Sequence, residues 1–336
     1  MSITRRVKWL AYRKSSFVLI ACILLLWICG LFDHLRETSF EHFQWPPYDI
    51  NVLVETRRAI GGKPARVTAE NDVKSFRNVA IPSCQSASKA LKLLIVVKSA
   101  VANIEQRNAI RKTWGARRRY EYVQTVFVVG KGVEDDMQEL VQEEVDRHGD
   151  ILYVDLIDSY RNNTRKFIHS IIFGFEPGNG CQSPDFLLLV DDDYMVNVRG
   201  LLRHISDENR LLQLYEGWMF NTTPFRFRFH KHYTSLEMYP FDRYPPYISA
   251  GAVLMSHNTV AHFYHALQLV RIYPFDDVYA GILAYLLQIH PRHNEAFVFW
   301  TRPIDAKEWK NGDVLVAHGY SPNQLLYEYN DVIQST

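Results

Sequence analysis

The chain has 336 residues, with 38 lysines and arginines against 37 aspartates and glutamates, so its formal net charge is +1. This near-neutral balance, without a basic tail, excludes the electrostatic footprint of a nucleic-acid-binding protein. The hydrophobic share of 47% is that of a globular protein, and the length allows one large domain or two ordinary ones.

The chain begins with a basic segment that is followed by an apolar one. Residues 1–14 hold five lysines and arginines, and residues 15–32 have no charge. As a helix, this run would span roughly 27 Å at about 1.5 Å per residue, close to the thickness of a thin bilayer. We predict a cytosolic tail (1–14), a transmembrane signal-anchor (15–32) and a lumenal remainder, because positive residues stay on the cytosolic side. A cleaved signal peptide is the alternative, but the run is long for one.

Two further features depend on the lumenal location. Cys84 and Cys181 lie beyond the predicted anchor and could form a disulfide in an oxidising compartment. Asn162 and Asn221 begin short sequons that could carry N-linked glycans where they are exposed. Isolated cysteines and short sequons also occur by chance. The sequence alone therefore decides neither whether the disulfide forms nor whether the asparagines carry glycans.

Residues 33–88 have weak periodicity and predict a stem, and residues 89–336 predict the catalytic domain. In the second region, apolar β-branched runs alternate with helix-like segments. The predicted strands are LKLLIVVKSA, VQTVFVVG, ILYVDLID and FLLLV, and the predicted helices are NIEQRNAIRKTWG, VEDDMQELVQEEVDRHGD and NTRKFIHSIIFGF. This alternation predicts an α/β fold with a mostly parallel central sheet flanked by helices. Ligands of such sheets bind at the carboxyl ends of the strands.

Three consecutive aspartates, Asp191, Asp192 and Asp193, end the FLLLV strand. Like charges repel, and a divalent cation with oxygen ligands is the simplest group that offsets them. In an extended chain Asp191 and Asp193 point to one side and Asp192 to the other, so the outer pair could reach one metal–nucleotide unit. A solvated acidic turn is the alternative.

Four stretches in this order resemble the β-1,3-glycosyltransferase family of galactosyl- and N-acetylglucosaminyltransferases: RNAIRKTWG, VDDDYMVN, YPFDRYPPYISAGAVLMS and PFDDVYAGI. SLEMYPFDRYPPY and FDDVY are most similar to the brainiac-type branch. The resemblance implies the glycosyltransferase A-type fold, a single-pass type II Golgi membrane protein, and transfer of N-acetylglucosamine from UDP-GlcNAc to a terminal mannose of a glycolipid in β-1,3 linkage. A UDP-Gal-dependent galactosyltransferase is the nearest alternative, and a non-catalytic lectin-like or folding-partner relative is a more distant one.

The resemblance also implies roles for the acidic residues. Inverting transfer requires a general base for the acceptor hydroxyl and a Lewis acid for the leaving diphosphate. Asp277 occupies the position of the base. Asp191, Asp193 and His318 are the expected ligands of Mn²⁺, with Mg²⁺ as the alternative, because an imidazole ligand favours Mn²⁺. The alternatives are an acidic helix N-terminus for Asp276 and Asp277, and a packed or exposed histidine for His318.

The remaining candidates are expected around the substrate. The nucleotide-sugar group comprises Lys98, Arg107, Arg111 and Asp192. Arg107 and Arg111 are four residues apart and share a helix face, so they are predicted to contact the diphosphate or to build the donor site. The acceptor and sugar wall comprises Tyr244, Tyr247, Gly251 and Asp276. A glycine there would permit close approach of the sugar, and a structural turn with positive φ is the alternative.

Overall fold

The computed structural model describes residues 3–63, 66–72, 75–83, 91–117, 119–178 and 182–332. The chain divides into a smaller unit, Met1–Gln44 with Asn221–Tyr244, and a larger unit, Trp45–Phe220 with Pro245–Thr336. Cys84 and Cys181 lie outside the described residues, so their pairing stays a prediction.

The larger unit is built on an eight-stranded sheet with the order β1-β4-β3-β2-β5-β8-β7-β9. Strands β4, β3, β2 and β5 are parallel to one another, and β8 joins β5 in the antiparallel sense. The strands are β1 (Asn78–Ala80), β2 (Leu93–Lys98), β3 (Val123–Lys131), β4 (Ile151–Ile157), β5 (Phe186–Asp191), β7 (Tyr215–Phe220), β8 (Tyr247–Ser256) and β9 (Arg292–His293). A second sheet has the order β10-β11-β6, formed by Phe297–Val298, Val316–His318 and Tyr194–Val196.

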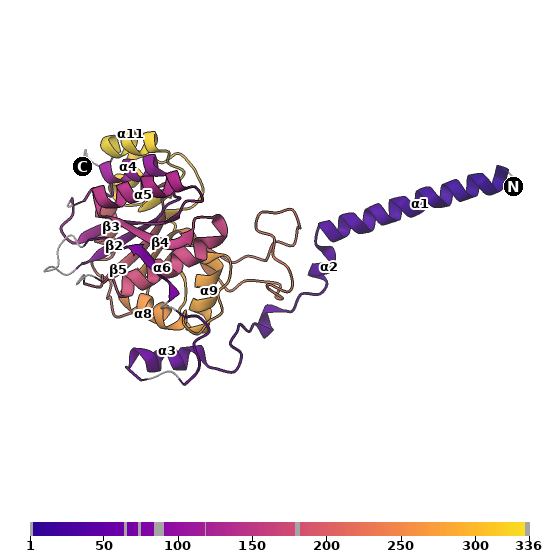
Figure 1. Ribbon diagram of the computed structural model, residues 1–336, viewed down its shortest axis with the longest axis horizontal. Helices are drawn as coiled ribbons and strands as arrows, with labels where there is room; N and C mark the ends of the chain where they lie inside the picture. The colour runs from indigo at the N-terminus through magenta and orange to yellow at the C-terminus, as the bar shows by residue number, and fades with distance from the viewer. Residues whose placement is uncertain are drawn as a thin grey trace. The chain divides into compact units, whose positions relative to one another are not determined.

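Helices cover both faces of the main sheet. Figure 1 shows α4, α5 and α11 on one side of the strands and α6, α8 and α9 on the other. The helices of this unit are α3 (Val52–Ile60), α4 (Ile104–Lys112), α5 (Asp135–His148), α6 (Asn163–Phe175), α7 (Val198–His204), α8 (His257–Ala266), α9 (Asp276–Leu286), α10 (Ala306–Asn311) and α11 (Pro322–Val332), with the 3-10 turn Tyr160–Asn162. The predicted α/β class is confirmed, although the sheet is mixed.

Strand β2 has the burial and the register of a central strand in a parallel part of a sheet. All six of its residues are buried, as expected for a strand that is covered on both faces. Its register with β5 places Lys98 directly opposite Asp191. The two carboxyl ends therefore meet at one edge of the sheet, where the aspartate cluster begins.

The larger unit begins well before residue 89, where the sequence predicted the start of the catalytic domain. Trp45 is buried, and its indole N–H donates to the Arg271 carbonyl at 2.8 Å. Helix α3 packs on α8, and β1 pairs with β4. Much of the predicted stem (33–88) thus belongs to the folded unit. Its short elements lack the periodicity by which sequence patterns reveal structure.

The smaller unit contains α1 (Ile3–Ile28), α2 (Leu31–His34) and the 3-10 turn Phe40–His42 together with the segment Asn221–Tyr244. Within the described part of the chain, no helix combines the length and the apolar character needed to cross a membrane. The transmembrane anchor predicted for residues 15–32 is not supported by this finding and remains a prediction.

Candidate active site

One lysine joins the two acidic motifs that the sequence places far apart. Lys98, the last residue of β2, lies with its Nζ 3.1 Å from Oδ1 of Asp191 and 2.7 Å from Oδ2 of Asp276. Burial alone would lower the pKa of Lys98, but the two carboxylates raise it, so the lysine stays charged. The aspartate cluster and the start of α9 therefore belong to one site.

Asp277 is the second residue of α9 and lies beside this ion pair. Its Oδ1 accepts a hydrogen bond from the Val278 backbone N–H at 2.8 Å. Burial and the neighbouring charge of Asp276 raise the pKa of Asp277 to about 7, against the opposing charge of Lys98. Asp277 is thus both a helix N-terminal acid and a carboxylate whose pKa suits a general base at neutral pH.

A cavity of ≈ 400 Å³ opens at the carboxyl ends of β2 and β5. Its lining combines the aspartate cluster with the loop after β2 and the start of α6. The lining residues include Lys98, Ser99, Ala100, Val101, Asn103, Asp158, Tyr160, Lys166, Asp191, Asp192 and Asp193. Lys98 also lines a second, narrow cavity with Asp276 and Asp277. The position at the strand ends is where open α/β sheets bind their ligands.

Asp193 and His318 come together through the second sheet. Strands β6 and β11 pair antiparallel, and His318 Nε2 lies 3.1 Å from Asp193 Oδ2. The other imidazole nitrogen, Nδ1, lies 3.2 Å from Thr301 Oγ1, which orients the ring. Oδ1 of Asp193 is buried and has no hydrogen-bond partner among the described residues. An orphaned carboxylate oxygen beside an imidazole fits one face of a divalent cation.

The third predicted metal ligand, Asp191, is engaged differently. Burial, Asp276 and Asp193 raise its pKa to about 6, although Lys98 opposes the shift. Across the described ranges, no group of three or more His, Cys, Asp or Glu side chains is arranged to hold a metal ion. The residues therefore fit a cation that takes only a few ligands from the protein and the rest from phosphate oxygens and water, as Mg²⁺ and Mn²⁺ sites of nucleotide enzymes do.

Asp192 points away from Asp193 and is held by the loop that follows β2. Its Oδ2 accepts hydrogen bonds from Ser99 Oγ at 2.6 Å and from Asn103 Nδ2 at 3.0 Å. Gln106 Nε2 donates to the Asp192 carbonyl at 2.7 Å. Asp192 and Asp193 form a turn between β5 and β6 rather than the expected extended chain, and the Asp192 side chain faces the loop before α4.

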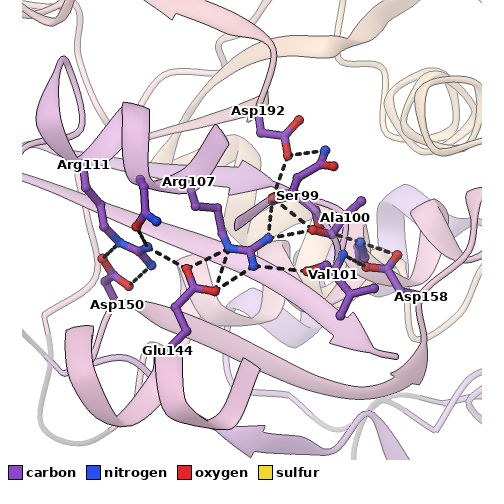
Figure 2. Close-up of polar contacts among 12 residues, drawn as sticks. Ser99, Ala100, Val101, Arg107, Arg111, Glu144, Asp150, Asp158 and Asp192 are labelled. Carbon is purple, nitrogen blue, oxygen red and sulfur yellow. Dashed lines mark hydrogen bonds and ion pairs between the residues drawn. The ribbon is translucent and has the colours of Figure 1, made fainter. Parts of the chain in front are cut away.

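Behind Asp192 lies the polar network that Figure 2 shows. Arg107 donates through Nη1 to Ser99 Oγ at 2.9 Å and to the Ala100 carbonyl at 2.6 Å, and through Nη2 to the Val101 carbonyl at 3.2 Å. Its Nε and Nη2 bind both carboxylate oxygens of Glu144. Arg107 is fully buried. Of the two predicted roles for this arginine, the geometry favours building the donor site over contacting the diphosphate.

Arg111 extends the same network away from the cavity. Its Nη1 lies 2.6 Å from Glu144 Oε1, and its Nε and Nη2 donate to the Asp150 carboxylate, both at 2.8 Å. Its guanidinium carbon lies 4.7 Å from the centre of the Phe127 ring. Arg111 is therefore a structural residue of the α4–α5 interface, and its charge is already paired within the protein.

Glu144→Gln tests this network. Burial alone would raise the pKa of Glu144, but Arg107 and Arg111 lower it below its ordinary value of 4.5. The stability that Glu144 contributes is present above pH 4.5 and is lost as the pH falls through its folded pKa. We expect the variant to lose about 3 kcal/mol of unfolding free energy at pH 7, measured by urea denaturation, because the buried Arg107 loses its carboxylate partner and Arg111 keeps only Asp150.

Glu143→Gln is the matched control on the same helix, because Glu143 is exposed and lies 4.0 Å from Arg147. It should change stability by less than about 0.5 kcal/mol. The network would have no structural importance if both variants unfolded at the same urea concentration at pH 7, or if the deficit of Glu144→Gln persisted unchanged below pH 4.

Gly251 lies inside strand β8 rather than in a turn. A Cβ at this position would lie 2.1 Å from the Tyr194 hydroxyl, so the glycine makes room for that ring. Tyr194 is buried, and its carbonyl accepts the Trp114 indole N–H at 3.1 Å. The alternative of a turn with positive φ at Gly251 is wrong, and the residue that lies against this glycine is Tyr194, the first residue of β6 in the second sheet.

The predicted aromatic wall is divided between the two units. Tyr247 begins β8 in the larger unit and lies against Gly281 of α9, where a Cβ would come within 2.6 Å of the Tyr247 Cβ. Tyr244 belongs to the smaller unit, where it is buried and its hydroxyl lies 3.1 Å from Thr234 Oγ1. Of the two sequon asparagines, Asn162 donates to the Ile157 carbonyl at 2.7 Å, and Asn221 is exposed.

Several residues that shape the cavity were not predicted from the sequence. Lys166 of α6 lies 2.7 Å from Asp158 Oδ1 and donates to the Ser99 carbonyl at 2.9 Å. Asp158 Oδ2 in turn accepts the Val101 backbone N–H at 2.8 Å. Ser99, Asp158 and Lys166 come from three different segments and are joined only by the topology of the sheet. A charged residue at the carboxyl end of a predicted parallel strand was the one available indication, and it applies to Asp158.

Comparison with known proteins places the chain in a family. The model of the Galactosyltransferase family matches residues 105–295. A β-1,3-galactosyltransferase, bre-5, from Caenorhabditis elegans is 38% identical over 98% of this chain and 96% of its own length. The chain belongs to the galactosyltransferase family. It is therefore a glycosyltransferase, as the four motifs predicted.

Other members of the galactosyltransferase family are also similar along most of the chain. The β-1,3-galactosyltransferase brn from Drosophila melanogaster is 33% identical over 95% of this chain and 97% of its own length. The human UDP-GalNAc:β-1,3-N-acetylgalactosaminyltransferase 1 is 28% identical over 73% of this chain and 75% of its own length. Among solved structures, the galactosyltransferase LgtC with donor and acceptor sugar analogs is 14% identical, covers 73% of this chain and 94% of its own, and has a TM-score of 0.33.

Proposed function

We propose that this galactosyltransferase-family chain is an inverting, metal-dependent transferase that moves a sugar from a UDP-sugar to an acceptor hydroxyl in β-1,3 linkage. The observation that carries the proposal is the bridge from Asp191 through Lys98 to Asp276, which joins the aspartate cluster to the start of α9. Asp277, the carboxylate expected to act as base, is the next residue of that helix. The names of the relatives, all β-1,3-transferases, support the linkage.

The residues divide the chemistry between two sides of the site. Asp277 takes the proton of the acceptor hydroxyl as that oxygen attacks the anomeric carbon of the donor. Asp193 and His318 would hold the divalent cation, which when bound supplies Lewis acidity to the leaving diphosphate. Lys98 offsets part of the negative charge of Asp191 and Asp276. Asp192 is oriented by Ser99 and Asn103 at the donor cavity. One displacement of an α-linked donor then yields a β product.

Two donors remain in competition. The resemblance of SLEMYPFDRYPPY and FDDVY to the brainiac-type branch supports UDP-GlcNAc, with a mannose-terminated glycolipid as the acceptor. The names of two relatives favour UDP-Gal as the second candidate. We propose UDP-GlcNAc. The apolar run over 15–32 supports attachment to a Golgi membrane with the larger unit in the lumen, which also belongs to the proposal.

A donor-by-acceptor assay on the detergent-solubilised full chain tests the proposal. UDP-GlcNAc and UDP-Gal are each offered with mannosyl- and galactosyl-terminated lipids, with Mn²⁺ or with EDTA. We expect transfer from UDP-GlcNAc to the mannosyl lipid, with loss of turnover in EDTA and recovery when Mn²⁺ is returned. Transfer from UDP-Gal alone would select the second candidate, and transfer from neither donor would contradict the proposed activity.

Asp193→Ala is the paired variant for the metal. Titration calorimetry of UDP should show tighter binding with Mn²⁺ in the native chain, and this dependence should disappear in the variant, because the orphaned oxygen is gone. Asp313→Ala, at an exposed position, is the control. Equal Mn²⁺ dependence in both variants would remove Asp193 from the metal site.

A further inference from the structure

The smaller unit contains a segment whose exposure pattern is the reverse of that of a soluble surface. Phe225, Phe227 and Phe229 are exposed by 48%, 43% and 77%. Between them, Arg226 is 1% exposed, and the Arg228 side chain is only 22% exposed. Water favours charged groups outside and large apolar groups inside. An alternation of outward phenylalanines with inward arginines indicates that this surface faces something other than water alone.

Arg226 fixes the segment to the chain that follows α2. Its Nε lies 2.7 Å from Glu37 Oε1, and its other nitrogens donate to the carbonyls of Thr234, Tyr239 and Phe241. Its backbone lies directly against Gly30, where a Cβ would come within 2.5 Å of the Arg226 Cβ. Gly30 also has φ +82, which only glycine adopts readily.

Arg228 fixes the same segment to the end of α1. Its backbone N–H donates to the Ile28 carbonyl at 3.1 Å, and its guanidinium carbon lies 4.1 Å from the centre of the Trp27 ring. It also lies 3.0 Å from Asp33 Oδ2. The exposed phenylalanines are therefore held where the apolar part of α1 ends. That helix exposes Phe17, Val18, Leu19, Ile20, Ile23, Leu24, Leu25, Leu26 and Trp27.

We infer that residues 225–232 form a membrane-contact loop, whose phenylalanines enter the interfacial region of a lipid bilayer beside the end of α1. The charge of the segment supports a lipid surface over a protein partner. Residues 224–236 contain no aspartate or glutamate, and Lys231 is exposed between two histidines. Exposed aromatic rings with basic side chains beside them suit the interfacial region of a bilayer. Trp27 and Tyr233, whose rings both lie near the Arg228 guanidinium, are residue types enriched at that depth.

The membrane-contact loop would favour lipid-linked acceptors over soluble ones in the proposed reaction. This consequence depends on the proposed function, whereas the lipid contact itself does not. An enzyme held on the bilayer by its loop meets a lipid-linked acceptor at high local concentration, and a soluble acceptor gains nothing from the contact. The loop should therefore separate the two kinds of acceptor without changing the chemistry.

Photo-cross-linking tests the contact directly. The full chain carries p-benzoyl-phenylalanine in place of Phe229 and is reconstituted in phosphatidylcholine vesicles containing one-fifth phosphatidylserine. Mass spectrometry should find lipid adducts at this position, as at Leu24 of α1, which reports that the chain is bound. Tyr327 of α11 is 73% exposed in the larger unit, and the same probe there should give none. Adducts at position 24 but not at 229, or adducts between protein chains at 229, would overturn the inference.

The second arm measures activity with the double variant Phe227→Ser/Phe229→Ser. Turnover of a vesicle-borne glycolipid should fall about tenfold, while turnover of the same sugar on a soluble aglycone stays unchanged. Tyr327→Ser should change neither. Equal losses on both acceptors would indicate damage to the fold and overturn the role of the loop. If the native chain turns over neither acceptor, the proposed function fails, and the cross-linking result stands by itself.

Discussion

Asp277→Asn is expected to lower kcat by about 10²- to 10⁴-fold, the usual contribution of a positioned general base, while the Kd for UDP stays unchanged. The asparagine keeps the size of the side chain and its hydrogen bond from the Val278 N–H, so the start of α9 should persist. Only the ability to accept a proton is lost. Steady-state kinetics with saturating donor, together with calorimetry of UDP, separate this loss from a loss of binding.

The pH dependence provides a second signature of Asp277. Because its pKa is raised to about 7, native kcat/KM should rise with pH and level off above that value, since only the ionised carboxylate accepts the proton. The stability effect has the opposite sign. A carboxyl whose folded pKa is raised stabilises the protein below its unfolded pKa of 3.8, and this contribution is lost as the pH rises toward 7. Asp277→Asn should therefore be at least as stable as the native chain at pH 8.

Asp136→Asn is the matched control, because Asp136 also lies in the first turn of a helix, α5, and is exposed. If the effect of Asp277 came only from its interaction with the helix dipole, both variants would lose stability of about 0.3–1 kcal/mol and keep their turnover. Native turnover in Asp277→Asn, or a pH profile without a limb near 7, would refute the assignment of this residue as the base.

The sequence predicted those parts of the fold that depend on local pattern. Strands β2 and β5 are continuous apolar runs, and the aspartates after β5 lie at a carboxyl strand end, as the parallel arrangement required. The antiparallel β8 was not predicted as a strand, because its run YISAGAVLMS has small residues and a glycine at its centre, which weaken a strand pattern. The stem assignment for 33–88 was too long, since α3 and β1 are short and are stabilised by contacts with distant segments.

In the candidate site, too, some residues were predicted from local sequence patterns, whereas others are brought together only by the fold. Asp193 and His318 are 125 residues apart and meet only through the pairing of β6 with β11. No property of either local sequence specifies that pairing, and their association came from the family resemblance. Arginine often binds phosphate, so the residue type alone favours that role for Arg107. The structure instead pairs Arg107 with Glu144 of α5, a residue that belongs to no motif.

Lys98→Met is expected to damage both folding and catalysis. The methionine fills a similar volume without charge, so the carboxylates of Asp191 and Asp276 lose the cation between them. Removing one partner of a buried ion pair costs roughly 3–5 kcal/mol, and the lower end applies here because the Asp191 side chain is 39% exposed. Lys92→Met is the control, because Lys92 directly precedes the other end of β2, is less buried and lies 3.7 Å from Asp185. It should cost less than about 1 kcal/mol in the same urea titration.

The kinetic effect of Lys98→Met follows from the same ion pair. Lys98 lowers the pKa of Asp277, so without it that pKa should rise above 7. The kcat/KM limb should therefore move to higher pH, with a large loss at pH 7 that is partly recovered at pH 9. Lys98→Arg keeps the charge and should return the limb toward its native position. A limb that stays near pH 7 in Lys98→Met would mean that the lysine does not couple the aspartate cluster to the base, and that the two motifs act independently.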